Sequence, residues 1–213
     1  SIGGSQTLTS DQPLPDSAYP SALKNEKEEN ISLTFTKGEL TKVNGEKGSQ
    51  VELIQILQHQ AKQFAIGRDI HVGDTIIGIK GRVGFEAAAP TIIIKAHHLL
   101  EKHTLSKWQQ FQKEQLANFY GMQLHEGHYL DPVMRDMEAF MESSQKQVNG
   151  SVFIKLHPYR FDLLGIQSPN DLMQAEFGSY GEMNKGWTAE EAKGFIKLTA
   201  NATKIYQHLN KEK

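Results

Sequence analysis

Hydrophobic and polar residues alternate along two parts of the chain in the way that half-buried β-strands require. The first alternating stretch, residues 31–36, leads through a Lys-Gly turn into a second strand over 39–43. The other part comprises residues 151–156 and 160–164, on either side of a His-Pro-Tyr turn. Both patterns predict antiparallel hairpins.

Apolar residues at three- and four-residue spacing predict several helices between and after these hairpins. Ser49 with Glu52 forms a capping box before the first helix, and Thr188 with Glu191 forms another before the last. Helices are predicted over residues 50–66, 90–104, 105–120, 132–148 and 188–210, with a break over 121–127. The stripe of the first helix that is expected to pack on the sheet consists of Val51, Ile54, Leu57, Ala61 and Phe64.

Residues 74–101 combine features that rarely occur together. The β-branched residues Thr75, Ile76, Ile77 and Ile79 predict a strand that is punctuated by glycines, and its end carries three charges, Lys80, Arg82 and Glu86. Such charges are seldom buried unless they are paired or face a ligand. The helix that begins near Pro90 is too apolar to lie on a surface. The stretch therefore predicts either a site for a polar small molecule or a purely structural ion-pair cluster.

Composition narrows the possible partners. With 213 residues the chain is long enough for a full core, and its net charge of −2 gives no reason to expect nucleic acid or an anionic membrane as partner. The absence of cysteine excludes disulfides, thiolate metal sites and a cysteine nucleophile. No apolar run approaches the roughly 20 residues that span a bilayer. The chain lacks both a signal peptide and an initial methionine, so we expect a processed product or a piece of a longer protein.

Histidines are the candidate metal ligands. His125 and His128 have metal-like spacing, but Gly127 interrupts a helix and no carboxylates stand at helical offsets, so a surface turn is the preferred interpretation over zinc. His97, on the apolar helix, is interpreted as a hydrogen-bonded core histidine. The sequence contains no Gly-x-Ser-x-Gly, Walker or Rossmann motif.

Several segments do carry a recognisable pattern. They are Gly67-Arg68, the run from Ile77 to Glu86, Ala96-His97, and the segment from Glu101 to Thr104. In this order and spacing they resemble the synthetase domain of argininosuccinate synthase, and the likeness extends over nearly the whole chain. The expected fold is α+β, a mixed sheet with hairpins packed against several helices and a long C-terminal helix used in oligomerisation. Residues 1–30 are expected to form an arm, 31–186 the synthetase domain and 187–213 the oligomerisation helix.

The resemblance implies a carbon–nitrogen ligase of arginine biosynthesis. Such an enzyme joins citrulline and aspartate with ATP, through citrullyl-AMP, and releases AMP and pyrophosphate. The family binds ATP with magnesium on an N-terminal domain that has a Ser-Gly-Gly-x-Asp-Ser/Thr loop. This chain has no such loop, so we expect no cofactor on it and no turnover by it alone. A cytoplasmic homotetramer with no nucleic-acid or membrane partner is implied.

Substrate contacts can be carried over from the family at a few positions. Ser1 lies at the place of a citrulline-contacting serine, whereas Gly73 and Phe85 replace a glutamate and a tyrosine. Both replacements remove a binding partner of the charged α-amino group of citrulline. Either Asp74 takes the place of the glutamate from the next position, or the substrate is an N-acylated citrulline, which lacks that charge.

The charged residues of the same run match the family pattern without a known role. Arg82 and Glu86 are substrate-binding candidates, and a guanidinium near the citrulline carboxylate would be favourable. The alternative is a structural ion-pair cluster that also includes Lys80.

The terminal helix bears two apolar strips, more than one docking surface needs. Phe195, Leu198, Ala202, Ile205 and Leu209 form one strip, and Ala192, Ile196, Thr199 and Tyr206 form the other. We expect this helix to pack on another subunit. A non-catalytic oligomerisation module is the alternative function.

Overall fold

The computed structural model describes residues 10–75, 77–174 and 186–210. The chain divides into two compact units, Ser1–Asp171 and Leu172–Lys213, which are described separately below. Ser1 and Ile76 lie outside the described residues. Among the described residues, no helix is both long and apolar enough to cross a membrane.

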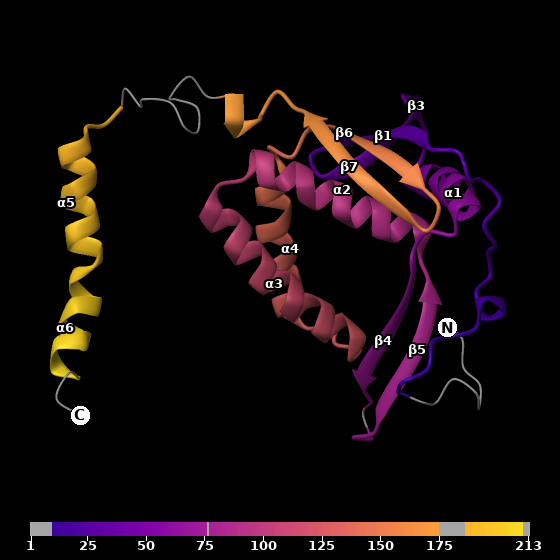
Figure 1. Cartoon of the computed structure of the whole chain (residues 1–213), viewed down its shortest axis with the longest axis horizontal. Helices are drawn as coiled ribbons and strands as arrows, with labels where there is room; N and C mark the ends of the chain where they lie inside the picture. The colour runs from indigo at the N-terminus through magenta and orange to yellow at the C-terminus, as the bar shows by residue number, and fades with distance from the viewer. Residues whose placement is uncertain (1–9, 76, 175–185, 211–213) are drawn as a thin grey trace. The chain divides into compact units, whose positions relative to one another are not determined.

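A five-stranded sheet forms the centre of the first unit (Figure 1). Its strands are β3 (Glu46–Lys47), β2 (Glu39–Val43), β1 (Glu29–Thr36), β6 (Gly150–His157) and β7 (Arg160–Gln167), in that spatial order. Both expected hairpins are present, as β1–β2 and β6–β7. The α+β class is confirmed, and all described strand pairs are antiparallel, which is narrower than the expected mixed sheet.

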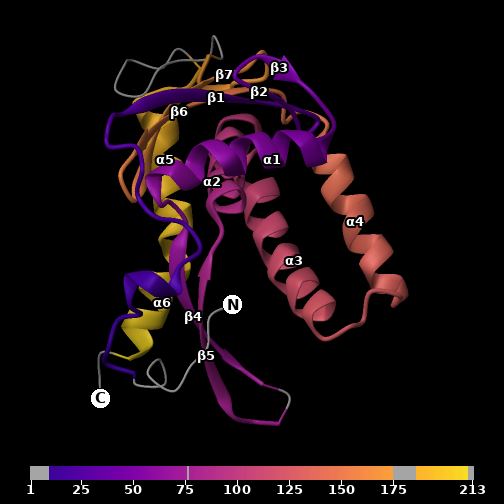
Figure 2. The ribbon, with the colours of Figure 1, turned by 90° about the vertical axis from the view of Figure 1, so that its right-hand side faces the viewer.

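Helices α1 (Gln50–Ala61) and α2 (Ala88–Thr104) cover one face of this sheet (Figure 2). The period-two pattern sends alternate residues of the central strands β1 and β6 toward these helices. The resulting core includes Ile31, Leu33, Phe35, Val152, Ile154 and Leu156 from the sheet and Leu53, Leu57, Ile92, Ala96 and Leu100 from the helices.

The expected inward stripe of α1 was partly wrong. The capping box at Ser49 and Glu52 is present, but Val51 and Ile54 are exposed and Leu53 is buried instead. The stripe follows Leu53, Leu57 and Ala61 because these positions share the face that α2 and β2 contact. The short 3₁₀ helix η3 (Lys62–Phe64) then completes the segment.

Helix α2 is less buried than its composition predicts. It begins two residues before Pro90, and its Ile94 is 66% exposed, so it is not enclosed on all sides. Helices α3 (Lys107–His125) and α4 (Pro132–Gln145) follow as an antiparallel pair that extends from α2 (Figure 2). No residue of α3 is buried, although the structure describes the whole helix.

The expected break over residues 121–127 was wrong. Helix α3 continues through Gly121 to His125, since a single glycine inside a helix costs only about 1 kcal/mol. The stop comes at Gly127, whose positive φ of 82° and N–H bond to the Leu124 carbonyl terminate the helix. Asp131 caps α4, as its position before Pro132 predicts.

The strand expected from Thr75 onward was partly wrong, because it begins only at Lys80. Thr75 and residues 77–79 lie between β4 (Arg68–Asp74) and β5 (Lys80–Glu86), which make a separate two-stranded sheet that projects from the five-stranded sheet (Figure 1). Gly78 has a positive φ of 76°, and Thr75 bonds to Ile79 through its backbone N–H and its hydroxyl. Ile77 and Ile79 point into solvent because a glycine-centred turn overrides their β-propensity.

The second unit contains the 3₁₀ helix η4 (Leu172–Gln174), α5 (Ala189–Thr199) and α6 (Asn201–Leu209). The capping box of Thr188 and Glu191 is present, and the long helix bends at Ala200. Among the described residues of this unit, large side chains from both apolar strips are exposed. They are Phe195, Ile196, Leu198, Ile205, Tyr206 and Leu209.

Candidate functional site

The register of the β4–β5 hairpin assigns its side chains to two faces. Residues directly opposite each other in an antiparallel pair share a face, and successive residues alternate between faces. The arm-side face carries Arg68, Ile70, Val72 and Asp74 together with Lys80, Arg82, Gly84 and Glu86. The opposite face carries Asp69, His71 and Gly73 together with Gly81, Val83 and Phe85.

The N-terminal arm lies against the first of these faces, which is why we call it the arm-side face. A Cβ added at Gly84 would overlap Leu14 Cδ1, so a larger residue there would displace the Leu14 side chain. The Arg82 guanidinium donates to the carbonyl of Gln12 at 2.7 Å. Further along the arm, the 3₁₀ helix η2 (Asp16–Ala18) precedes the contacts made by Ser21.

Glu86 is held by a buried set of partners. Its side chain is 3% exposed, the Ser21 hydroxyl donates to its Oε1 at 2.6 Å, and Arg68 Nε lies 3.5 Å from its Oε2. A buried carboxylate requires such pairing because an isolated charge is costly to desolvate. Glu86 therefore joins β5 to the arm and to the start of β4.

Asp74 and Lys80 form an exposed ion pair at the tip of the same hairpin, with 2.6 Å between Oδ1 and Nζ. Opposite-charge pairs across two strands stabilise a hairpin modestly when they are exposed to water. The charged positions of the arm-side face thus have partners within the chain: Asp74 with Lys80, Arg82 with Gln12, and Glu86 with Ser21 and Arg68.

Gly73 and Phe85 lie on the opposite face. A Cβ added at Gly73 would lie 2.6 Å from His71 Nε2, the end of a flexible side chain. Asp69 stands directly across from Phe85 and is exposed, so it is the carboxylate on this face. The structure therefore separates Gly73 and Phe85 from the other described candidates, while Ser1 lies outside the described residues.

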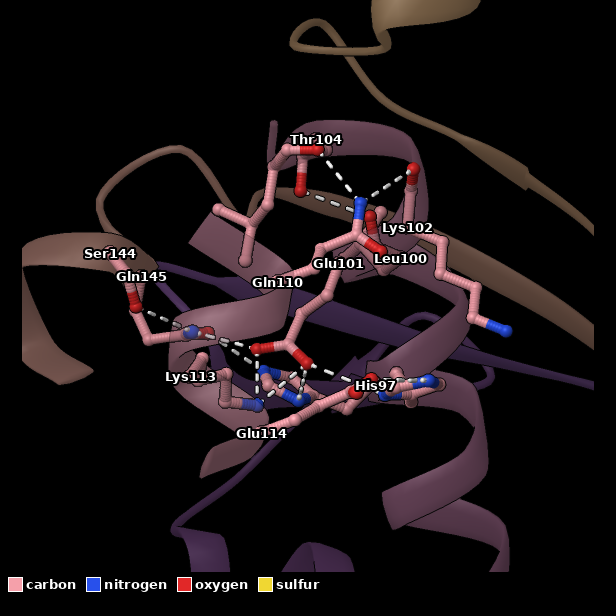
Figure 3. A network of polar contacts seen from close by, with 12 residues as sticks. His97, Leu100, Glu101, Lys102, Thr104, Gln110, Lys113, Glu114, Ser144 and Gln145 are labelled. Carbon is pink, nitrogen blue, oxygen red and sulfur yellow. Dashed lines mark hydrogen bonds and ion pairs between the residues drawn. The ribbon is translucent and has the colours of Figure 1, made fainter. Parts of the chain in front are cut away.

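A second polar cluster lies where α2, α3 and α4 meet (Figure 3). The Glu101 side chain is 3% exposed, and both its oxygens lie within 2.6 Å of Lys113 Nζ. The Gln145 amide donates to Glu101 Oε1 at 2.8 Å. Figure 3 shows the carboxylate of Glu101 pointing between these groups and His97. The cluster joins α3, which has no buried residue, to α2 by charge pairing, and it joins α4 to α2 through the Gln145 amide.

His97 is a hydrogen-bonded, largely buried histidine, as its place on the apolar helix indicates. Its Nε2 lies 2.9 Å from the Gln145 carbonyl oxygen, which accepts because the Gln145 amide nitrogen donates to Glu101. Burial lowers the pKa of His97 below its ordinary value of 6.5, and Lys113 acts in the same direction against the opposing charge of Glu101. The imidazole is therefore neutral near pH 7.

A cavity of about 340 Å³ lies beside this cluster. His97, Lys113 and Gln145 line it together with Lys37, Gly38, Glu39, Glu138, Met141 and Glu142. Its charges are mixed, and the most buried of them, Lys113, is paired with Glu101. Among the described residues, no group of three histidine or acidic side chains could hold a metal ion.

Sequence reasoning did not assign roles to Arg68 and Glu101, although both belong to the segments that carried the resemblance. A signal was available for Glu101, because a carboxylate on an apolar helix four residues after His97 predicts a buried polar network. For Arg68 the sequence offered no comparable signal, since its partners other than Glu86 come from residues 16–21 and 159.

Comparison with known proteins identifies the family. Residues 14–206 match the family model described as "Arginosuccinate synthase C-terminal domain". The chain belongs to this family. Among its relatives, the argininosuccinate synthase of Xanthomonas campestris pv. campestris is 34% identical over 92% of the chain and 48% of its own length. The argininosuccinate synthase of Methanocaldococcus jannaschii is 30% identical over 100% of the chain and 54% of its own length.

The argininosuccinate synthase of Dictyoglomus turgidum is 34% identical over 92% of the chain and 49% of its own length. The chain thus spans about half the length of the curated relatives it matches. The family match covers the described first unit from residue 14 onward and most of the second unit.

Proposed function

We propose that this chain is the substrate-binding and subunit-assembling part of an argininosuccinate synthase. In this proposal the enzyme joins citrulline and aspartate with ATP through citrullyl-AMP, and it acts in the arginine biosynthesis of the cytoplasm as a homotetramer. The observation that carries the proposal is the family match over residues 14–206. It is supported by relatives that bear the name argininosuccinate synthase at 30–34% identity over 92–100% of the chain.

Within this proposal, the opposite face of the β4–β5 hairpin is a wall of the citrulline site. Gly73 and Phe85, which stand at family contact positions, both lie on that face. Arg82 and Glu86 support the wall from behind, because their partners are on the arm. Asp74 contributes to the hairpin tip through Lys80, and Ser1 is proposed to bind the amino-acid end of citrulline.

In this proposal ATP and magnesium bind to the N-terminal nucleotide-binding domain of the family. The described residues contain no group of three histidine or acidic side chains suited to a metal ion, and the sequence has no Ser-Gly-Gly-x-Asp-Ser/Thr loop. We therefore assign no residue of this chain to the nucleotide. The role of the chain is then to bind and orient the amino-acid substrates.

The first prediction compares the chain with a hybrid enzyme in a pyrophosphate-release assay. The hybrid enzyme joins this chain to the part of the Xanthomonas campestris relative that lies outside the match. We expect no sustained release by the chain alone, and release by the hybrid that requires both citrulline and aspartate. Sustained turnover by the chain alone, or a folded, assembled hybrid that ignores citrulline, would contradict the proposal.

A second substrate, N-acylated citrulline, is favoured by one observation. Gly73 and Phe85 offer neither a carboxylate nor a phenol to an α-ammonium group. Asp69 argues for free citrulline, because it places a carboxylate on the same face, directly across from Phe85. Replacing citrulline by N-acetylcitrulline in the hybrid assay decides between them: the higher kcat/KM identifies the substrate.

A further inference from the structure

Arg68 connects three separate parts of the first unit at the base of the hairpin. It donates to Asp16 Oδ1 at 3.2 Å and to the Ser21 carbonyl of the arm. Its Nε lies 3.5 Å from Glu86 on β5. The Arg68 side chain is 14% exposed, and of its two carboxylate partners only Glu86 is buried, so the ion pair with Glu86 is the one withdrawn from water.

Two aromatic rings lie close to the same guanidinium. Its central carbon lies 4.6 Å from the centroid of the Tyr19 ring and 5.7 Å from that of Tyr159. Tyr19 belongs to the arm and Tyr159 to the turn between β6 and β7, so the rings approach from different parts of the fold. A planar guanidinium is suited to such stacking, whereas a lysine ammonium is not.

Tyr159 takes this position in an unfavourable backbone conformation. Its φ is +66°, in the region that glycine and asparagine adopt readily and bulky residues avoid. The backbone N–H of Tyr159 donates to the Phe64 carbonyl at 2.7 Å, which holds the turn against the body of the first unit. A strained residue retained in a turn that glycine or asparagine would satisfy indicates a use for its side chain.

These contacts lie at the base of the β4–β5 hairpin, where they can control its orientation. Arg68 is the first residue of β4, Glu86 is the last of β5, and they are directly paired in the register. Next to this pair along the chain, the backbone N–H of Ala87 donates to the Gly67 carbonyl at 2.9 Å, and this bond closes the base of the hairpin. The tip of the hairpin projects away from the five-stranded sheet (Figure 2), so a small tilt at the base displaces the far end most.

We propose that Arg68, in a clamp that it forms with Tyr19 and Tyr159, is a positioning residue that sets the angle of the β4–β5 hairpin and so places its opposite face for substrate. The inference rests on the proposed function for its effect on citrulline, but the clamp itself is independent of it. In this account the strain at Tyr159 is retained because the ring, and not the turn, is what the site requires.

Three variants separate this role from ordinary stabilisation. Tyr159→Asn removes the ring and places a residue that tolerates the positive φ, whereas Tyr159→Phe keeps a ring next to the guanidinium. Arg68→Lys keeps the charge and loses the fork and the stacking. The matched control is Tyr129→Asn, since Arg135 lies 4.5 Å from the Tyr129 ring on the α3–α4 pair, away from the hairpin.

Hydrogen exchange on the complete chain tests the clamp directly. We expect amides of β4 and β5 to exchange roughly tenfold faster in Tyr159→Asn and Arg68→Lys, with β1 and β6 unchanged. The melting temperature of Tyr159→Asn should be equal to or above that of the parent, because asparagine tolerates the turn. Tyr159→Phe and Tyr129→Asn should exchange like the parent. Parental exchange in β4 and β5 of the first two variants would overturn the clamp.

Steady-state kinetics of the hybrid enzyme test its effect on substrate. Tyr159→Asn and Arg68→Lys should raise the KM for citrulline roughly tenfold or more and leave kcat within about threefold, as a displaced binding wall does. An unchanged KM beside altered exchange would overturn the positioning role. A parent hybrid without turnover would instead refute the proposed function, and the exchange measurement would then decide the clamp alone.

Discussion

Buried charge at single residues holds together helices that have little apolar contact. Glu101 and Lys113 lie at the junction of three helices, and α3 contributes no buried residue there. A buried pair of this kind stabilises less than its Coulomb attraction implies, because both ions lose their water. Removing one partner, however, leaves the other charge buried without compensation.

The second prediction concerns this pair. Glu101→Gln should lower the free energy of unfolding by about 3 kcal/mol, because Lys113 loses its counter-ion. The double variant Glu101→Leu with Lys113→Met should recover most of that loss, since apolar groups of similar volume replace both ions. Urea denaturation measures all three proteins. A double variant less stable than Glu101→Gln would show that the remaining polar partners, Gln145 and His97, depend on the carboxylate.

At the scale of elements, the hairpin β4–β5 depends on backbone shape at its base. Gly67 has a φ of +86°, and a Cβ there would lie 2.6 Å from the carbonyl carbon of Ala87. Gly45 has nearly the same φ, +84°, with nothing within 4 Å of the added Cβ. The two glycines therefore share a conformational requirement but differ in the space around them.

The third prediction uses that difference. Gly45→Ala should cost about 1 kcal/mol, the price of forcing alanine into the left-handed region. Gly67→Ala should cost clearly more, at least about 2 kcal/mol, because the chain at Ala87 and Ala88 must also move. Thermal unfolding of both variants measures the difference. Equal losses of stability would show that the backbone at Ala87 and Ala88 moves easily. That result would contradict a rigid base that fixes the orientation of the β4–β5 hairpin.

Local patterns predicted the elements of this fold better than their limits and contacts. Period-two alternation and caps identified β1–β2, β6–β7 and α4, because these depend on neighbouring residues. The turn around Gly78 was missed because its left-handed conformation outweighs the preference of Ile77 and Ile79 for a strand. The two faces of the hairpin were not predictable either, since they follow from the register with β5 and from the arm.

At the scale of the whole molecule, the second unit has an apolar surface that none of the described residues covers. Phe195, Leu198, Ile205 and Leu209 are all exposed on α5 and α6. Contiguous exposed apolar side chains on a helix are typical of an interface between subunits.

The fourth prediction follows from this surface. The purified chain should scatter light as an oligomer, and the double variant Leu198→Glu with Ile205→Glu should shift it toward the monomer, because charge is not tolerated in an apolar contact. Exchanging the exposed pair Lys193 and Lys197 for glutamine changes the net charge by the same amount and controls for charge alone. A parent chain that stays monomeric at high concentration would contradict the oligomerisation role.

The proposed function depends on which face of the β4–β5 hairpin meets citrulline. Val83 on the opposite face and Val72 on the arm-side face provide a matched pair, since both are exposed valines of one hairpin. The decisive measurement is the KM for citrulline of hybrid enzymes that carry Val83→Lys or Val72→Lys. We predict that Val83→Lys raises this KM roughly tenfold or more while Val72→Lys leaves it within about twofold. Equal effects of the two variants, or a larger effect of Val72→Lys, would contradict the assignment.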